Sequence, residues 1–137
     1  MDKFAMIIFG ASGDLTKRKL MPALYSLFRE KRLTGDFHIL GIGRTIYSDE
    51  DYRSYISGEL RTFVKSEEQD AALMEAFISH LCYLPMDPAK EEGYAMLRQR
   101  LVELTNEVDP DNLLFYLATP PSLYGVVPLH LKAAGLN

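Results

Sequence analysis

The fold class of this chain follows from residues 4–20, which read Phe4-Ala5-Met6-Ile7-Ile8-Phe9-Gly10-Ala11-Ser12-Gly13-Asp14-Leu15-Thr16-Lys17-Arg18-Lys19-Leu20. The first six residues are apolar and predict a buried strand, and the last six predict the start of a basic, amphipathic helix. Between them, the glycines of a Gly-Ala-Ser-Gly turn let the backbone approach an anion closely. The free amides and the dipole of a helix N-terminus favour negative charge. The stretch therefore predicts a phosphate-binding turn.

The side chains of this turn add to that prediction. Ser12 and Thr16 offer hydroxyl donors, and the basic run that begins at Lys17 offers a local positive field. Asp14 would repel a phosphate, so we expect it to cap the following helix instead. The two glycines are three residues apart and do not form a G-x-G-x-x-G fingerprint. The spacing alone leaves an ordinary strand-to-helix connection open.

Composition limits the classes of protein to which the chain can belong. With 137 residues, 47% of them apolar and 25% charged, it fits one globular domain with a sizeable core. The net charge of −4 argues against binding to nucleic acid or to a membrane surface. No apolar run has the length of a transmembrane helix, and no secretory leader is visible. The cytoplasm is the expected location.

The single cysteine, Cys82, excludes an internal disulfide and suits a reducing compartment. It lies in the apolar stretch Leu81-Cys82-Tyr83-Leu84. We therefore expect a buried structural thiol rather than a nucleophile.

Apolar runs of strand length alternate with longer segments of helical periodicity along the whole chain. The runs predict strands at Phe4–Phe9, Phe37–Ile42, Leu81–Leu84 and Leu113–Ala118. The first periodic segment predicts a helix that begins near Pro22, after a short turn that follows Gly13, and ends around Leu33-Thr34-Gly35. The other periodic segments predict helices from Ser48 to about Val64, at Ala71–Ser79, at about Lys90–Asn106 and at about Leu123–Ala134.

This alternation predicts an α/β fold, a three-layer, doubly wound parallel sheet. The chain stops at Asn137, where a fifth strand would be due, so we expect a domain incomplete at its C-terminus and cut from a longer protein. A domain cut in this way is then expected to expose apolar residues such as Leu129, Leu131 and Leu136.

In a doubly wound sheet, ligands bind outside the carboxyl ends of the strands. At the second strand end, a dinucleotide fold that prefers NAD usually places a carboxylate for the ribose 2′-hydroxyl. Here the strand ends with Arg44 and no acid, and a guanidinium can pair with a 2′-phosphate. This favours NADP over NAD, although a plain surface arginine remains equally open.

The other two strand ends carry weaker signals. Asp87 and Pro88 follow the third strand and would flank an adenine, although Asp87 also suits a simple turn. The stretch Ala118-Thr119-Pro120-Pro121-Ser122-Leu123-Tyr124 follows the fourth and would lie along the nicotinamide half. Tyr124 is then a stacking or hydrogen-bonding residue, or otherwise a half-buried helix residue.

The sequence offers no catalytic or metal-binding constellation. The three histidines, His38, His80 and His130, are scattered and have no acidic or cysteine neighbour at ligand spacing. No catalytic acid–base pair can be assembled, and no tyrosine precedes a lysine by four residues, as a short-chain reductase would need. We therefore assign no catalytic residue and no metal.

Three motifs together resemble the glucose-6-phosphate dehydrogenase family. Residues 8–20 resemble its G-A-S-G-D-L-A-x-[KR]-K motif, with Thr16 where alanine is usual. Gly41-Ile42-Gly43-Arg44 resembles its G-x-x-R element, and residues 114–124 resemble its F-Y-L-A-x-P-P-x-x-[YF] element. The motifs occur in order, with family-like spacing, over nearly the whole chain.

The resemblance implies a Rossmann-like NADP-binding domain over residues 1–137. Carried over by position, it implies that Arg44 takes the 2′-phosphate, Asp87 and Pro88 line the adenosine side, and Tyr124 lines the cofactor cleft. The pyrophosphate would be held by Gly10, Ala11, Ser12, Gly13, Asp14, Leu15, Thr16 and Lys17.

The family oxidises D-glucose 6-phosphate to 6-phosphoglucono-1,5-lactone with hydride transfer to NADP, in the oxidative pentose phosphate pathway. Its Glu-Lys-Pro segment and its histidine general base have no counterpart in this chain. The resemblance thus implies a coenzyme-binding fragment that is inactive alone, cut from a homodimer or homotetramer. The alternative is a stand-alone NADP-sensing module without catalysis.

Overall fold

The computed structural model describes residues 4–106 and 109–136. Four parallel strands form one sheet in the order β3-β2-β1-β4, with the first strand of the chain in the middle. The strands are β1 (Phe4–Phe9), β2 (Phe37–Gly43), β3 (Leu81–Pro85) and β4 (Leu113–Leu117). The parallel α/β sheet expected from the sequence is confirmed, and each strand end lies within one residue of its predicted position.

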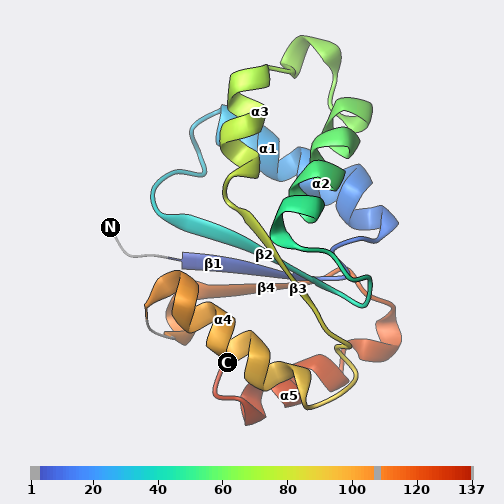
Figure 1. Ribbon diagram of the computed structural model, residues 1–137, viewed down its shortest axis with the longest axis vertical. Helices are drawn as coiled ribbons and strands as arrows, with labels where there is room; N and C mark the ends of the chain where they lie inside the picture. Colours follow the sequence, from blue (N-terminus) through green and yellow to red (C-terminus); the bar gives the residue numbers. More distant parts are fainter. Residues whose placement is uncertain (1–3, 107–108, 137) are drawn as a thin grey trace.

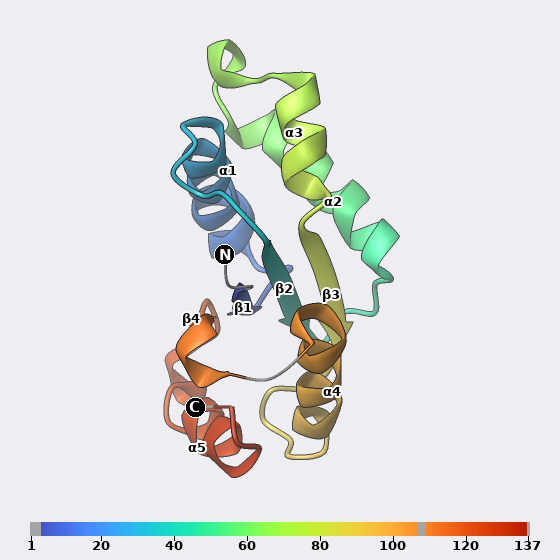
Figure 2. The ribbon, with the colours of Figure 1, turned by 90° about the vertical axis from the view of Figure 1, so that its left-hand side faces the viewer.

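Helices cover both faces of this sheet, which gives the three layers expected (Figure 1). On one face lie α1 (Met21–Arg29), α2 (Asp49–Phe63) and α3 (Ala71–Ile78); on the other lie α4 (Gly93–Thr105) and α5 (Val126–Ala133). The view turned by 90° shows the same separation, with α1 to α3 on one side of the strands and α4 and α5 on the other (Figure 2). None of the described helices is long and apolar enough to cross a membrane.

Strand β1 is buried on both faces because it separates two cores. Met6 and Ile8 pack against α1 to α3, whereas Ala5, Ile7 and Phe9 pack against α4 and α5. This alternation follows from the period of two along a strand. A central parallel strand therefore needs an uninterrupted apolar run, as residues 4–9 have.

The helix after the glycine turn differs from the prediction. Helical backbone continues without a break from Asp14 to Arg29, and residues Thr16–Leu20 form a π-helical turn, η1, that runs into α1. Pro22 lies at the second position of α1, directly after the π-helical turn, and does not interrupt the helix. The helix ends at Arg29, earlier than expected, because Lys31 adopts a left-handed conformation with φ of 61°.

Two further boundaries differ near the C-terminus. Helix α4 begins at Gly93 rather than near Lys90, and α5 begins at Val126 because a short 3-10 turn, η4 (Pro121–Leu123), precedes it. The exposure expected for Leu131 and Leu136 is wrong, because both are buried against the α4–α5 core. Leu129 is exposed as expected. The remaining short helical turns are η2 (Ser66–Glu68) and η3 (Pro110–Asn112).

Candidate functional site

A cavity of about 430 Å³ lies at the carboxyl ends of all four strands. This is where a doubly wound sheet binds its ligand, because the connections diverge there. A larger hollow of about 690 Å³ lies between α2 and α3, but it is not at the strand ends. The residues that line the strand-end cavity are Gly10, Ser12, Gly13, Gly43, Arg44, Asp87, Pro88, Ala89, Ala118, Thr119, Pro120, Ser122 and Leu123.

The turn after β1 requires glycine at its first position. Gly10 has φ of +88°, and a Cβ atom there would lie 2.5 Å from the carbonyl oxygen of Ala118. The Gly10 carbonyl accepts hydrogen bonds from the Gly13 amide at 3.0 Å and from the Thr16 hydroxyl at 2.8 Å. These two hydrogen bonds hold the backbone of the turn around the Gly10 carbonyl.

The turn leads directly into a helix whose first amides lack intrahelical acceptors. A helical hydrogen bond at its start runs from the Lys17 amide to the Gly13 carbonyl at 3.2 Å. The amides just before Lys17 therefore lie in the first turn of the helix. Gly10, Ser12 and Gly13 lie on the cavity wall, and the N-terminus of a helix next to a cavity is a suitable place for an anion.

The second strand end places a cation on the same cavity. Arg44 follows the last residue of β2, is exposed, and forms no ion pair with any residue of the described part of the chain. The preceding residue is fixed, because the Gly43 carbonyl accepts a hydrogen bond from the Met86 amide at 2.9 Å. The guanidinium is thus free to pair with an anion that enters from solvent.

The third strand end forms one rim of the cavity. The carboxylate of Asp87 accepts a hydrogen bond from the Ala89 amide at 2.9 Å, which closes a tight turn. The carbonyl of Pro88 accepts from the hydroxyl of Tyr94 at 2.7 Å. Asp87 is therefore both a turn residue, as the simpler interpretation held, and a lining residue of the cavity.

The fourth strand end closes the opposite rim. The Ala118 amide donates to the Phe9 carbonyl at 2.8 Å, so this loop sits directly on the glycine turn. The hydroxyl oxygen of Thr119 is buried and has no hydrogen-bond partner among the described residues. A buried hydroxyl without a partner is costly, and Thr119 lines the cavity.

Several of the predicted site residues do not line this cavity. The Thr16 hydroxyl is committed to Gly10, the Lys17 ammonium lies 4.0 Å from the Glu59 carboxylate on α2, and Tyr124 is half-exposed outside the cavity. The others are Ala11, which is fully buried, and Asp14 and Leu15, which lie on the exposed face of the helix.

The capping role expected for Asp14 is wrong. Its carboxylate accepts a hydrogen bond from Arg18 Nε at 2.6 Å, one helical turn further on, and the first helical turn has no side-chain cap. Ion pairs at this spacing form readily on a helix surface. Asp14 therefore does not point its charge into the turn.

The structure also adds lining residues that the sequence did not single out. Gly43 and Ala89 neighbour predicted residues, and Ala118, Thr119, Pro120, Ser122 and Leu123 belong to the stretch expected along the nicotinamide half. The prediction chose Tyr124 from that stretch because it is aromatic. The 3-10 turn η4 instead brings Ser122 and Leu123, the two residues before Tyr124, to the cavity wall.

No group of three or more histidine, cysteine, aspartate or glutamate side chains could hold a metal within residues 4–106 and 109–136. The cavity carries one cation, one carboxylate and several backbone and hydroxyl groups. This combination suits binding of a phosphorylated ligand rather than acid–base chemistry.

Comparisons with known proteins point to one enzyme family. The model of the family described as "Glucose-6-phosphate dehydrogenase, NAD binding domain" matches residues 7–137. The chain is 46% identical over 133 residues to the glucose-6-phosphate 1-dehydrogenase of Aggregatibacter actinomycetemcomitans, covering 96% of this chain and 26% of that protein. It is 32% identical over 135 residues to the glucose-6-phosphate 1-dehydrogenase of Leuconostoc mesenteroides, covering 98% of this chain and 27% of that protein.

Two solved structures share the fold. A glucose-6-phosphate dehydrogenase in complex with its substrate glucose-6-phosphate superimposes with a TM-score of 0.83 and 36% identity, covering 97% of this chain and 28% of that one. The glucose-6-phosphate 1-dehydrogenase of Mycobacterium avium superimposes with a TM-score of 0.82 and 25% identity, covering 97% of this chain and 27% of that one. The chain spans about a quarter of the length of the curated relatives it matches. It belongs to the glucose-6-phosphate dehydrogenase family and corresponds to the dinucleotide-binding domain of that family.

Proposed function

We propose that residues 1–137 are the NADP-binding domain of a glucose-6-phosphate dehydrogenase. The observation that carries this proposal is the single cavity that joins the Gly10–Gly13 turn to Arg44. An anion-binding turn and a free guanidinium on one cavity suit a dinucleotide that bears both a pyrophosphate and a 2′-phosphate. Bound NADP would supply the hydride acceptor.

The residues present fit this cofactor. Gly10, Ser12 and Gly13 line the cavity, and the helix that follows leaves its first amides without intrahelical acceptors. On the same cavity, the Thr119 hydroxyl, which has no hydrogen-bond partner in the described part of the chain, offers a hydrogen bond to a bound ligand. We assign the pyrophosphate to the turn, the 2′-phosphate to Arg44, and the adenosine side to Asp87 and Pro88.

Glucose 6-phosphate enters the proposal through the relatives. The full enzyme would oxidise it to 6-phosphoglucono-1,5-lactone, in the oxidative pentose phosphate pathway, as a cytoplasmic homodimer or homotetramer. The carboxylate on the described cavity wall belongs to Asp87 and accepts a hydrogen bond within a tight turn, and no second carboxylate or histidine lines that wall. We therefore infer that these 137 residues bind coenzyme but do not oxidise sugar by themselves.

A second candidate is an NADP-binding module that senses the coenzyme without catalysis. The same observation favours it, because the cavity holds binding groups without an acid–base pair. Assaying glucose 6-phosphate oxidation by the full-length protein separates the two candidates. Reduction of NADP supports the enzyme, and coenzyme binding without reduction supports the module.

Calorimetric titration with NADP and with NAD tests the proposal, using wild type and Arg44→Ala. Removing a charge-assisted contact should weaken NADP binding by about 1.5–3 kcal/mol and leave NAD binding unchanged. Arg32→Ala is the matched control, because Arg32 is also exposed but lies away from the cavity. Equal binding of both coenzymes, unchanged by Arg44→Ala, would refute the assignment of Arg44. Binding of neither coenzyme, by this chain and by the full-length protein, would refute the domain assignment.

A further inference from the structure

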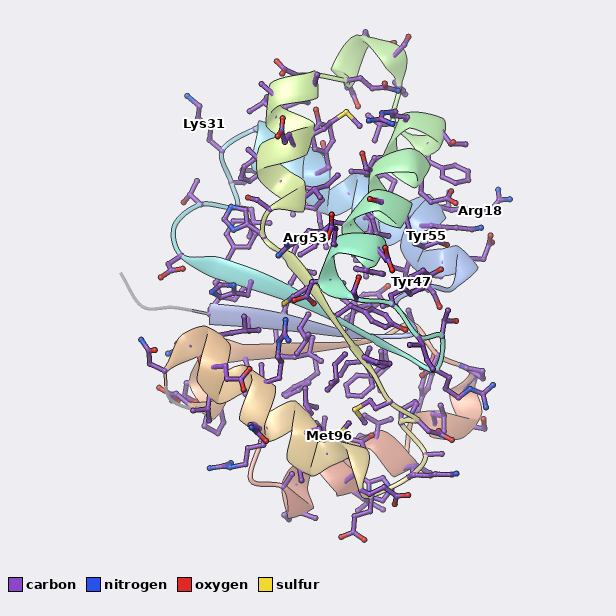
Figure 3. All side chains as sticks on the ribbon, viewed as in Figure 1. Arg18, Lys31, Tyr47, Arg53, Tyr55 and Met96 are labelled. Atoms are coloured by element: carbon purple, nitrogen blue, oxygen red, sulfur yellow. The ribbon has the colours of Figure 1, made fainter. Side chains whose placement is uncertain are left out.

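Four tyrosines pack together behind the strand-end cavity. Tyr47 lies in the loop after β2, Tyr52 and Tyr55 lie on α2, and Tyr83 lies on β3. We call them the tyrosine cluster. Figure 3 labels Tyr47 and Tyr55, whose rings stack with centroids 5.6 Å apart beside α2. The rings of Tyr52 and Tyr83 are 4.8 Å apart.

Two hydroxyls of the cluster hold consecutive carbonyls of the glycine turn. Tyr52 donates to the Ala11 carbonyl at 2.9 Å, and Tyr55 donates to the Ser12 carbonyl at 3.3 Å. In a trans peptide, the carbonyl and the following amide point in opposite directions. Anchoring the Ala11 carbonyl toward α2 therefore turns the amide of Ser12, a cavity residue, away from α2.

The hydroxyl of Tyr83 contacts the backbone segment that carries Arg44. Tyr83 donates to the Thr45 carbonyl at 2.6 Å. The same hydroxyl lies against Gly43, where an added Cβ would come within 2.7 Å of it. Tyr83 thus contacts the backbone on both sides of Arg44 and fixes the point from which the guanidinium extends.

Tyr47 joins the two anchored segments. Its ring lies 6.0 Å from Tyr52, 5.6 Å from Tyr55 and, edge-on, 5.3 Å from Tyr83. Aromatic pairs at these distances contribute a stabilisation in addition to that from burial of their surface. The cluster therefore connects the glycine turn to the Arg44 segment through one packed unit.

We propose that the tyrosine cluster positions both anion-binding segments of the dinucleotide site, with Tyr52 and Tyr55 holding the pyrophosphate turn and Tyr83 holding the 2′-phosphate arginine. The inference rests on the proposed function for the identity of the ligand. Burial raises the pKa of Tyr52 and of Tyr55, and raises the pKa of Tyr83 to about 12. The hydroxyls therefore stay protonated donors near neutral pH.

The division of labour gives a test that simple packing does not predict. Phenylalanine at each position keeps the ring and removes one hydrogen bond. Since a net hydrogen bond is worth about 1 kcal/mol, Tyr83→Phe should weaken NADP binding about fivefold to tenfold and leave NAD binding unchanged. Tyr52→Phe should weaken both coenzymes by a similar factor, because both carry the pyrophosphate.

Tyr25→Phe is the matched control. Tyr25 is also buried, and its hydroxyl donates to the Glu68 carbonyl at 2.9 Å, away from the cavity. This variant should lose comparable stability and bind both coenzymes as wild type does. Loss of NADP and NAD binding by the same factor in Tyr83→Phe, or unchanged binding in Tyr52→Phe, would overturn the inference.

A second measurement separates this inference from the proposed function, because it needs no coenzyme. Backbone amide NMR of the Tyr52→Phe chain should show shifts concentrated at residues 10–13, and of the Tyr83→Phe chain at residues 43–46. If neither this chain nor the full-length protein binds a coenzyme, the proposed function fails, while these shifts still decide whether the cluster positions the two segments. Shifts spread equally over both segments in each variant would overturn the positioning.

Discussion

The carboxylate of Asp49 accepts a hydrogen bond from the backbone amide of Tyr83 at 2.8 Å, on the outer edge of β3. Two residues earlier on the same edge, the Leu81 carbonyl accepts from Arg53 Nε at 2.7 Å. Arg100 on α4 also pairs with Asp49, which lies at the N-terminus of α2. Two side chains of α2 thus occupy backbone groups that a further strand would use, and Arg100 from the other helical layer pairs with one of them, Asp49.

Asp49→Ala should lower the free energy of unfolding by about 2–3 kcal/mol, because it leaves the Tyr83 amide and the Arg100 guanidinium without their acceptor. Urea denaturation followed by circular dichroism measures this. Asp51→Ala is the control, since Asp51 lies in the same acidic first turn of α2 but is exposed. It should cost less than about 1 kcal/mol. Equal losses in the two variants would show that the helix dipole, not the edge contact, accounts for the effect.

The opposite edge of the sheet, β4, receives no side-chain hydrogen bond from the described residues, and Leu114 on it is 55% exposed. We expect the 137-residue chain to self-associate through this edge, and Leu114→Lys to reduce that association, because an edge charge blocks strand pairing. Sedimentation velocity measures it. Met96→Lys, an equivalent change on the exposed face of α4, should have no effect. If it matches Leu114→Lys, the edge is not the contact.

Substitution by alanine should lower the free energy of unfolding at one glycine and raise it at another. Gly10→Ala should lower the free energy of unfolding by about 2–4 kcal/mol, because it places a Cβ on the Ala118 carbonyl at a positive φ. Gly58→Ala in α2, where a Cβ would meet nothing within 4 Å, should raise it by about 0.5–1 kcal/mol. Thermal and urea unfolding of both variants check this. A destabilised Gly58→Ala would contradict the helical packing described.

Stability should fall in alkali partly through Cys82. Burial raises the pKa of its thiol from 9.0 to about 11, so the folded state holds this proton more tightly than the unfolded chain. The resulting stabilisation is complete below about pH 9 and is lost as the pH rises toward about 11. At about 1.4 kcal/mol per pKa unit, it amounts to about 2–3 kcal/mol.

The difference in unfolding free energy between wild type and Cys82→Ala isolates the contribution of the Cys82 thiol, because the tyrosines titrate in both proteins. In reducing buffer, that difference should shrink by the stated amount between pH 8 and pH 11. A difference that stays constant over this range would contradict the raised thiol pKa.

Local patterns were enough to predict the strands but not the ends of the helix after the turn. The run Phe4–Phe9 is apolar throughout and matches β1. The π-helical turn at Thr16–Leu20 and the left-handed Lys31 have no comparable signal, because a lysine rarely adopts positive φ and the sequence pattern does not report backbone hydrogen-bond spacing.

The candidate site was predictable where it depends on backbone and not where it depends on distant partners. The glycine turn and Arg44 follow from strand ends, which topology brings together. The commitment of the Thr16 hydroxyl to Gly10, and of the Lys17 side chain toward Glu59, depends on packing after folding. The hydroxyl contacts of Tyr52 and Tyr55 span more than forty residues and leave no local trace.

The central position of β1 has a consequence for the order in which the protein takes shape during synthesis. The glycine turn is made before the other strand ends, yet Gly10 and Phe9 contact Ala118, which is made more than a hundred residues later. β2 and β3 and their helices can assemble on one side of β1 before that. The part of the cavity wall that is made first is therefore among the last to reach its final form, because the cavity is incomplete until β4 is in place.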